Sequence, residues 1–205
     1  MKPVVYTKNY NAPDVDRREI LRYAKVGGAD GLSEELLESC LAEICGKVDF
    51  RVCFAEFPLN KCENGIDLGF AKTDSHSLCK NLENCSSVIV FCATVGIEID
   101  RLIARYSKIQ PSRSVMLQAI GTERVEALCD AFCKELSAER EDCKLHSRFS
   151  PGYGDLPLDM QREIFRALEC GKRIGVTLGE NLFMTPTKSV TAIIGVEKSK
   201  VNFAK

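Results

Sequence analysis

The sequence predicts an α+β fold with a mainly antiparallel, twisted sheet and flanking helices. Helical and strand periodicities are mixed along the 205 residues without the regular strand–helix–strand alternation of a parallel sheet. Two pairs of short strands are spaced like hairpins. Hydrophobic residues make up 45% and charged residues 28%, close to the globular average. This length and composition favour one hydrophobic core, and we expect a single unit over residues 1–205.

The first quarter of the chain predicts one strand and two amphipathic helices. We expect the strand at residues 3–7 and the first helix over residues 16–25, ended by Gly27 and Gly28. The apolar stripe of this helix is formed by Ile20, Leu21 and Ala24. Ser33 predicts the N-cap of the second helix, because two glutamates follow in the first turn. Its apolar face consists of Leu36, Leu37, Cys40, Leu41 and Ile44.

Strand patterns dominate the next stretch. Residues 48–54 alternate apolar and polar side chains, which predicts a half-buried strand. Residues 66–70 are expected to form its hairpin partner, because the Asn-Gly pair between them is a turn signal. A short helix follows over residues 75–82. Residues 87–95 are continuously apolar, which predicts a strand buried on both faces.

The second half begins with helices. Gly96 ends the apolar strand, and residues 97–109 resume a helical period up to an interruption at Pro111. Residues 113–139 predict a second long helix with Gly121 near its middle.

The chain then predicts a loop, a helix and two strands. Residues 145–157 read as a loop, because they are rich in Gly, Pro and Ser. A helix over residues 158–169 and strands at residues 173–178 and 189–196 complete the expected fold.

The charge balance excludes some classes of function. Twenty-eight basic and 29 acidic side chains give a formal net charge of −1, which provides no field for attracting nucleic acid or an anionic membrane. No stretch approaches the roughly 20 apolar residues that span a bilayer, and the start of the chain lacks the apolar run of a secretory signal. We therefore expect a cytoplasmic protein that binds neither nucleic acid nor membrane.

The cysteines and histidines of the sequence do not have the spacing of metal ligands or of a catalytic site. Eleven cysteines occur without one CxxC pair, and several lie in apolar patterns where a thiol behaves as a small hydrophobe. We expect them to be buried or incidental thiols in a reducing compartment. His76 and His146 have no partner at metal-ligand spacing, and phosphate-binding, dinucleotide-binding and serine-hydrolase motifs are absent. No metal ligand and no catalytic triad is assigned.

The segment Arg148-Phe149-Ser150-Pro151-Gly152-Tyr153 is the most unusual in the chain. An Arg offers a bidentate fork to a carboxylate, a Gly permits close approach of the backbone, and a Tyr offers its ring face to a cation. The combination suits a small zwitterionic or cationic ligand. A purely structural loop is the alternative.

This segment, RFSPGYGDLP, followed later by NLFMTPTKSV, resembles the activation domain of cobalamin-dependent methionine synthase. That family carries an Arg-x-x-Pro-Gly-Tyr motif that binds S-adenosylmethionine and a Met-x-Pro-x-x-Ser-Val segment near its C-terminal strand. The second motif is matched by Met184, Pro186, Ser189 and Val190. The segments 86–96 and 121–132 also resemble stand-alone members of the family. The resemblance is best over residues 85–197 and weak over residues 1–84.

The resemblance implies a domain that docks over the cobalamin of methionine synthase after the cofactor has become inactive cob(II)alamin. S-adenosylmethionine then supplies a methyl group while a flavodoxin-type donor supplies an electron, and methylcobalamin is restored. Because these 205 residues include no recognisable cobalamin-binding domain, we expect an accessory methyl-transfer component acting in trans on a methionine synthase or another corrinoid protein. Attack of cob(I)alamin on a sulfonium methyl needs alignment but no protein base, so no catalytic residue is assigned.

The resemblance also implies the site residues. Arg148 would hold the carboxylate of S-adenosylmethionine, Ser150 and Gly152 would contribute backbone contacts, and Tyr153 would lie beside the sulfonium and near the corrin. Asp130 occupies the place of a family Glu that contacts the ligand's amino group. One turn earlier on the same helix face, Glu126 is expected to face the cobalamin-bearing partner together with Tyr153. The family's acidic ligand contact near the start of its domain is assigned to no residue.

Two other functions remain open from the sequence. A docking or scaffold factor for a corrinoid protein would retain the fold without using the methyl donor. A third reading places a metal or redox centre on some of the eleven cysteines.

Overall fold

The computed structural model describes residues 3–25, 31–63 and 65–198. In this part of the chain a five-stranded sheet has the order β1-β2-β6-β10-β7, and every neighbouring pair is antiparallel. Its strands are β1 (Tyr6–Tyr10), β2 (Phe50–Pro58), β6 (Ser87–Thr94), β10 (Ser189–Lys198) and β7 (Cys143–Leu145). The structure confirms the predicted α+β class and the antiparallel sheet.

The central strand β6 separates two hydrophobic cores, where the sequence predicted one, because its two faces pack against different sets of helices. Val88, Val90 and Cys92 face one core, and the residues between them, Ile89 and Phe91, face the other. All five side chains are fully buried. The prediction of a strand buried on both faces is confirmed, because helices cover both sides of the sheet.

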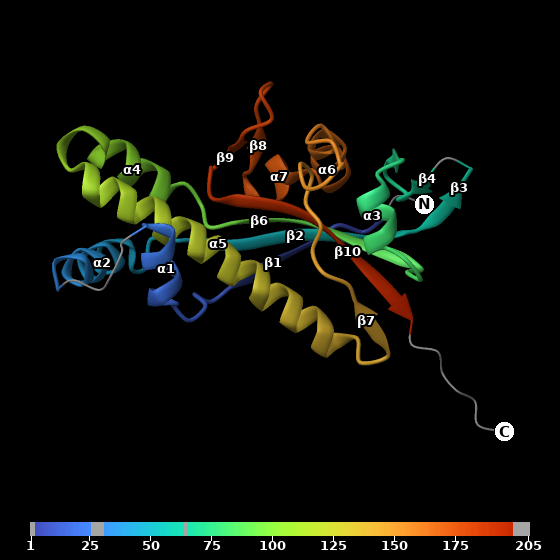
Figure 1. Ribbon diagram of the computed structural model, residues 1–205, viewed down its shortest axis with the longest axis horizontal. Helices are drawn as coiled ribbons and strands as arrows, with labels where there is room; N and C mark the ends of the chain where they lie inside the picture. Colours follow the sequence, from blue (N-terminus) through green and yellow to red (C-terminus); the bar gives the residue numbers. More distant parts are fainter. Residues whose placement is uncertain (1–2, 26–30, 64, 199–205) are drawn as a thin grey trace.

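The first core lies under four helices, which Figure 1 shows on one side of the sheet. They are α1 (Arg17–Tyr23), α2 (Gly31–Ile44), α4 (Glu98–Ile109) and α5 (Pro111–Glu139). Helix α5, 29 residues long, runs diagonally across the sheet (Figure 1). Its Phe132 ring packs against the rings of Phe54 and Phe91, with centroids 5.1 and 5.0 Å apart. Pro111 begins this helix at a position where a missing N–H has no consequence.

The second core lies under three short helices, α3 (His76–Asn81), α6 (Met160–Leu168) and α7 (Cys170–Ile174). Two small sheets extend this face. They consist of β3 (Asn60–Cys62), β4 (Gly65–Asp67) and β5 (Lys72–Thr73), and of β8 (Thr177–Leu178) and β9 (Met184–Thr185). Ser75, predicted as the first residue of this helix, is its N-cap, since its hydroxyl accepts the N–H of Leu78.

Several predicted boundaries are wrong for physical reasons. The first strand begins at Tyr6, where pairing with β2 becomes available, and Ser33 lies inside α2 because Gly31 is already helical. Residues 65–67 pair with residues 60–62 and not with residues 48–54, because β1 and β6 already occupy both edges of β2.

Residues 173–178 divide between α7 and β8. Arg173 and Ile174 belong to the helix, and Gly175 ends it with a positive φ of 73°. The predicted glycines at 27 and 28 lie outside the described residues. Within the described ranges, the structure has no helix both long and apolar enough to cross a membrane.

Candidate functional site

The Arg148–Tyr153 segment lies between β7 and α6 and passes over the edge of the sheet (Figure 1). Phe149 fixes it: its N–H and carbonyl pair with the carbonyl and N–H of Ile193 in β10, each at 2.9 Å, and its ring is buried. In extended backbone, neighbouring side chains point to opposite faces. Burial of Phe149 therefore directs Arg148 and Ser150 away from the second core.

After Ser150 the chain closes a compact turn. The Tyr153 N–H donates to the Ser150 carbonyl at 3.1 Å, and the Gly152 N–H donates to the Leu156 carbonyl at 2.9 Å. Gly152 has φ +87°, a conformation that other residues adopt only with strain. The Tyr153 side chain is 70% exposed and packs edge-on against Phe149, with ring centroids 5.3 Å apart. The turn presents an aromatic ring to solvent from a rigid backbone.

The far end of the turn is bound to α3 through Asp155. Its carboxylate accepts the N–H groups of His76 and Ser77, at 2.7 and 3.0 Å, and the hydroxyl of Ser75. The Ser75 hydroxyl, followed by these N–H groups, holds the pKa of Asp155 well below its usual range. A negatively charged carboxylate at a helix N-terminus is also stabilised by the positive end of the helix dipole.

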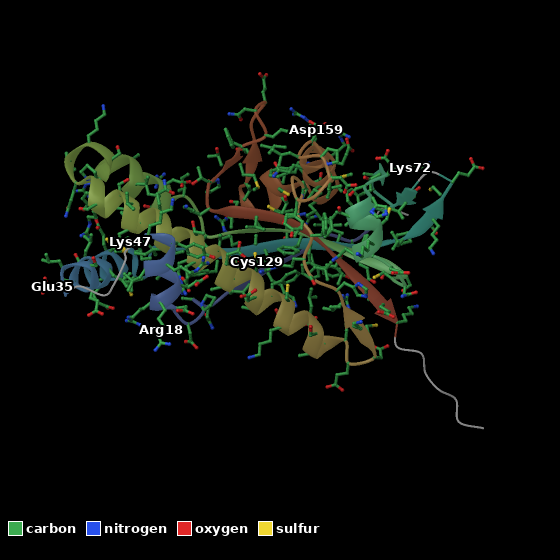
Figure 2. All side chains as sticks on the ribbon, viewed as in Figure 1. Arg18, Glu35, Lys47, Lys72, Cys129 and Asp159 are labelled. Atoms are coloured by element: carbon green, nitrogen blue, oxygen red, sulfur yellow. The ribbon has the colours of Figure 1, made fainter. Side chains whose placement is uncertain are left out.

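The Arg148 guanidinium reaches α5. Its Nη2 lies 2.9 Å from Asp130 Oδ1 and 3.2 Å from Glu126 Oε2. Burial raises the pKa of the neighbouring Cys129 and Cys133 thiols, so both are neutral at pH 7. Cys129, labelled in Figure 2, marks the part of α5 where this contact occurs. The structure therefore brings together three of the residues that the resemblance implied.

One guanidinium nitrogen of Arg148 lacks a hydrogen-bond partner among the described residues. This nitrogen, Nη1, is buried. An unpaired guanidinium N–H is costly to bury, because it loses its bonds to water without replacing them. A ligand carboxylate, which Arg can bind through two nitrogens, would satisfy Nη1 once the side chains that cover this atom move aside.

An acidic pocket of about 390 Å³ adjoins these contacts. Glu123, Glu126, Ala127 and Asp130 line one wall, and their spacing of three, four and seven residues places them on one face of α5. The other wall is the segment 13–23 at the start of the chain. Six of the nine lining residues are Asp or Glu, and none of the nine is Lys or Arg. The pocket favours a cationic group.

The sequence did not single out the second wall. Asp14 and Asp16 line the pocket, together with Glu19 and Tyr23 of α1. They lie more than 100 residues from Glu126 in the chain, and tertiary contacts of this segment and of α1 with α5 bring them together. A run of acidic residues before a predicted helix start was the available signal, but it is equally typical of ordinary N-capping.

The second motif has a structural role at the start of β10. The Ser189 hydroxyl donates to the Pro186 carbonyl at 2.7 Å and lies 2.9 Å from the Thr94 hydroxyl. Met184 belongs to the small sheet with β8, and Val190 packs against the first core. Among the described residues, these contacts hold the first residues of β10 against β6. None of the four residues of this motif lines the acidic pocket.

The cysteines and histidines do not form a metal site in the part of the chain that is described. No three His, Cys, Asp or Glu side chains there are grouped so that they could hold a metal ion. All eleven cysteines are free thiols, and five of them are buried. The His146 ring lies between the Asn81 carbonyl and the Glu197 carboxylate, which is a structural contact between α3 and β10.

This fold is that of a known reactivation domain. The structure matches the crystal structure of the MetH reactivation domain bound to AdoHcy with a TM-score of 0.66 and 17% sequence identity, over 95% of this chain and 79% of that chain. At this identity the match establishes the fold alone. No curated protein matches the sequence.

The sequence establishes the family. The family model for the activation domain of vitamin B12 dependent methionine synthase matches residues 78–204, more than half of the chain. The protein therefore belongs to the methionine synthase activation domain family. The match includes the Arg148–Tyr153 turn and all of α5.

The capping contact of Asp155 predicts a pH dependence of stability. Because the folded-state pKa of Asp155 is lowered, its contribution to stability is complete above the unfolded pKa of about 3.9 and is lost as pH falls through that value towards the folded pKa. We expect Asp155→Asn to lower the thermal midpoint at pH 7 and to flatten its decline between about pH 4 and pH 2. Thermal unfolding at several pH values measures both.

Asp159→Asn is the matched control, since Asp159 is an exposed residue near the same turn that pairs only with Arg162 among the described contacts. It should leave the midpoint and its pH dependence nearly unchanged. If Asp155→Asn shows the same acid profile as the wild type, the carboxylate does not hold the turn on α3.

Proposed function

We propose that this protein binds S-adenosylmethionine in the acidic pocket between α5 and the segment 13–23, with Arg148 of the adjoining turn as a further contact. There it serves the reductive reactivation of cobalamin on a partner protein. The observation that carries the proposal is the half-buried Arg148 guanidinium, which has an unpartnered Nη1 and lies beside an acidic pocket within a matched family motif. The MetH reactivation domain with the same fold was crystallised with AdoHcy, and S-adenosylmethionine differs from it by a methyl group on sulfur.

The charges of the ligand match the site. S-adenosylmethionine carries a carboxylate, an ammonium and a sulfonium. We assign the carboxylate to Arg148, and the ammonium to the acidic pocket at Asp130. Asp130 is 73% exposed, so its ion pair with Arg148 is weak enough for a ligand carboxylate to compete.

The turn supplies contacts of other kinds. Ser150 and Gly152 can present backbone groups to the ligand, and the exposed Tyr153 ring can lie beside the sulfonium, where a cation is attracted to its face. Asp14 and Asp16 are the candidates for the acidic contact near the start of the domain that the family resemblance implied.

The protein's contribution to the reaction is alignment. When bound, S-adenosylmethionine supplies a sulfonium methyl group for transfer to reduced cobalamin. Because a strong metal-centred nucleophile needs no protein base, the side chains act by orienting the ligand and stabilising its charges. Tyr153 and Glu126, both accessible beside the site, are proposed to face the cobalamin-bearing partner. That partner is a methionine synthase or another corrinoid protein, with a flavodoxin-type electron donor.

Arg148→Ala tests the carboxylate contact. Losing a charge-assisted hydrogen bond commonly costs about 1.5–3 kcal/mol, so affinity for S-adenosylmethionine should fall at least about tenfold. The melting temperature should be nearly unchanged, because the guanidinium lies outside both hydrophobic cores. Calorimetric titration and thermal unfolding measure the two effects.

Arg166→Ala serves as the control, because Arg166 is an exposed arginine of α6 that pairs with Glu163 in its own helix. Its affinity should equal that of the wild type. Equal affinity for Arg148→Ala would remove Arg148 from the site. Absence of any binding by the wild type at millimolar S-adenosylmethionine would instead favour a docking or scaffold role.

A graded series tests the turn. Gly152→Val should reduce S-adenosylmethionine binding most, because the positive φ disfavours a side chain and a Cβ would approach Leu158 Cδ1 to 3.2 Å. Tyr153→Ala should be intermediate, since a cation–π contact contributes about 0.5–2 kcal/mol. Tyr153→Phe should be mild, because the ring face remains. Titrations and a coupled turnover assay with a cob(II)alamin-loaded synthase give the order.

Gly171→Ala is the matched control for the glycine variant. Gly171 lies in α7, and a Cβ there would meet only the Val176 carbonyl oxygen at an ordinary 3.8 Å. It should bind normally. Normal binding by Gly152→Val would show that the turn is structural and that the ligand site lies elsewhere.

A further inference from the structure

The adjacent residues Glu123 and Arg124 form an ion pair that is almost completely buried. Their side chains are only 4% and 3% exposed, and two nitrogens of the guanidinium lie within hydrogen-bond distance of the carboxylate. Taking two charges out of water is costly, and an apolar pair of the same size often stabilises a fold as well or better. A contribution to the stability of the fold therefore does not by itself explain why this ion pair is buried.

The remaining hydrogen bonds of the pair all go to one segment. Arg124 donates to the carbonyls of Pro13 and Asp14, both at 2.6 Å, and Glu123 Oε1 accepts the N–H of Asp16 at 2.9 Å. Three backbone groups within four residues are thus bound to α5. These are the residues where the chain leaves β1 and enters α1, before the buried Ile20 anchors the helix.

That segment is the second wall of the acidic pocket. Pro13, Asp14 and Asp16 line the pocket opposite α5, and Glu123 itself is part of the α5 wall. The side chains of Asp14 and Asp16 are exposed, and the half-buried Val15 between them packs against the first core. The backbone contacts with Glu123 and Arg124 are the described hydrogen bonds that join this segment to α5, while the Asp16 carboxylate also caps α1 by accepting the N–H of Glu19 at 3.0 Å.

We propose that Glu123 and Arg124 are positioning residues for the ligand pocket: they hold the 13–16 segment against α5 and thereby place Asp14 and Asp16 opposite Glu126 and Asp130. The inference deepens the proposed function and rests on it for the identity of the ligand. The pair itself need not touch the ligand.

The chain offers a matched control in a second ion pair of α5. Arg113 pairs with Glu43 of α2, with side chains 11% and 17% exposed, and also donates to the Ser39 hydroxyl and carbonyl. It too binds a neighbouring segment to the same helix through a carboxylate and a backbone carbonyl. None of its residues lines the acidic pocket.

The experiment compares two double variants, Glu123→Gln/Arg124→Met and Glu43→Gln/Arg113→Met. Changing both partners avoids leaving an uncompensated buried charge, and Gln at 123 keeps an oxygen for the Asp16 N–H. For each protein, calorimetry measures the Kd for S-adenosylmethionine, and hydrogen exchange measures the protection of residues 13–20. Thermal unfolding shows whether both variants fold.

We expect the Glu123/Arg124 variant to bind at least tenfold more weakly and to exchange residues 13–20 at least tenfold faster than the wild type. The Glu43/Arg113 variant should match the wild type in both. Unchanged affinity of the Glu123/Arg124 variant, or equal losses in the two variants, would overturn the positioning role.

The exchange measurement needs no ligand and separates this inference from the proposed function. If the wild type does not bind S-adenosylmethionine, the proposed function fails. Faster exchange of residues 13–20 in the Glu123/Arg124 variant alone would still support the positioning role. Equal exchange in both variants would overturn it.

Discussion

The site depends on the neutralisation of one half-buried guanidinium. Arg148 is placed at the edge of the sheet because Phe149, its neighbour, is buried and paired with β10. A charge in that position needs opposite charge and hydrogen-bond acceptors, which Glu126 and Asp130 supply only in part. Arg51 and Arg140 also have a buried nitrogen without a partner among the described residues, but Arg148 pairs with two residues that line the acidic pocket. This arrangement makes the position a candidate for recognising an anion.

Helix α5 connects the fold to this site. One side of the helix buries Cys129 and Phe132 in the first core, which fixes its angle across the sheet. The adjoining face presents Glu123, Glu126 and Asp130 at helical spacing to the pocket. Two other elements, far apart in sequence, meet that face: the 13–16 segment and the Arg148–Tyr153 turn. A long helix with both a core face and an acidic face is therefore sufficient to assemble the pocket from distant parts of the chain.

Much of the fold and part of the site could be predicted from the sequence, because local patterns determine them. The apolar run at 87–95 indicated burial on both faces, and the Gly and Pro content of 145–157 indicated the loop. The resemblance to the family assigned Arg148 and Asp130 to the ligand and Glu126 to the surface facing the partner, and the ion pairs show that the three side chains meet. The pairing partners of the strands could not be predicted from local patterns. Residues 65–67 pair with residues 60–62 because β2 is already paired on both edges. The wall at Asp14 and Asp16 also depends on tertiary contacts that periodicity does not encode.

The central claim is that the pocket beside Arg148 is where S-adenosylmethionine binds. A crystal structure of the protein with S-adenosylmethionine or its demethylated analogue tests this most directly. We expect the ligand carboxylate at hydrogen-bond distance from the Arg148 guanidinium, with the ligand's amino group against the acidic face of α5. A ligand bound elsewhere on the protein, with Arg148 paired only to Asp130 and Glu126, would contradict it.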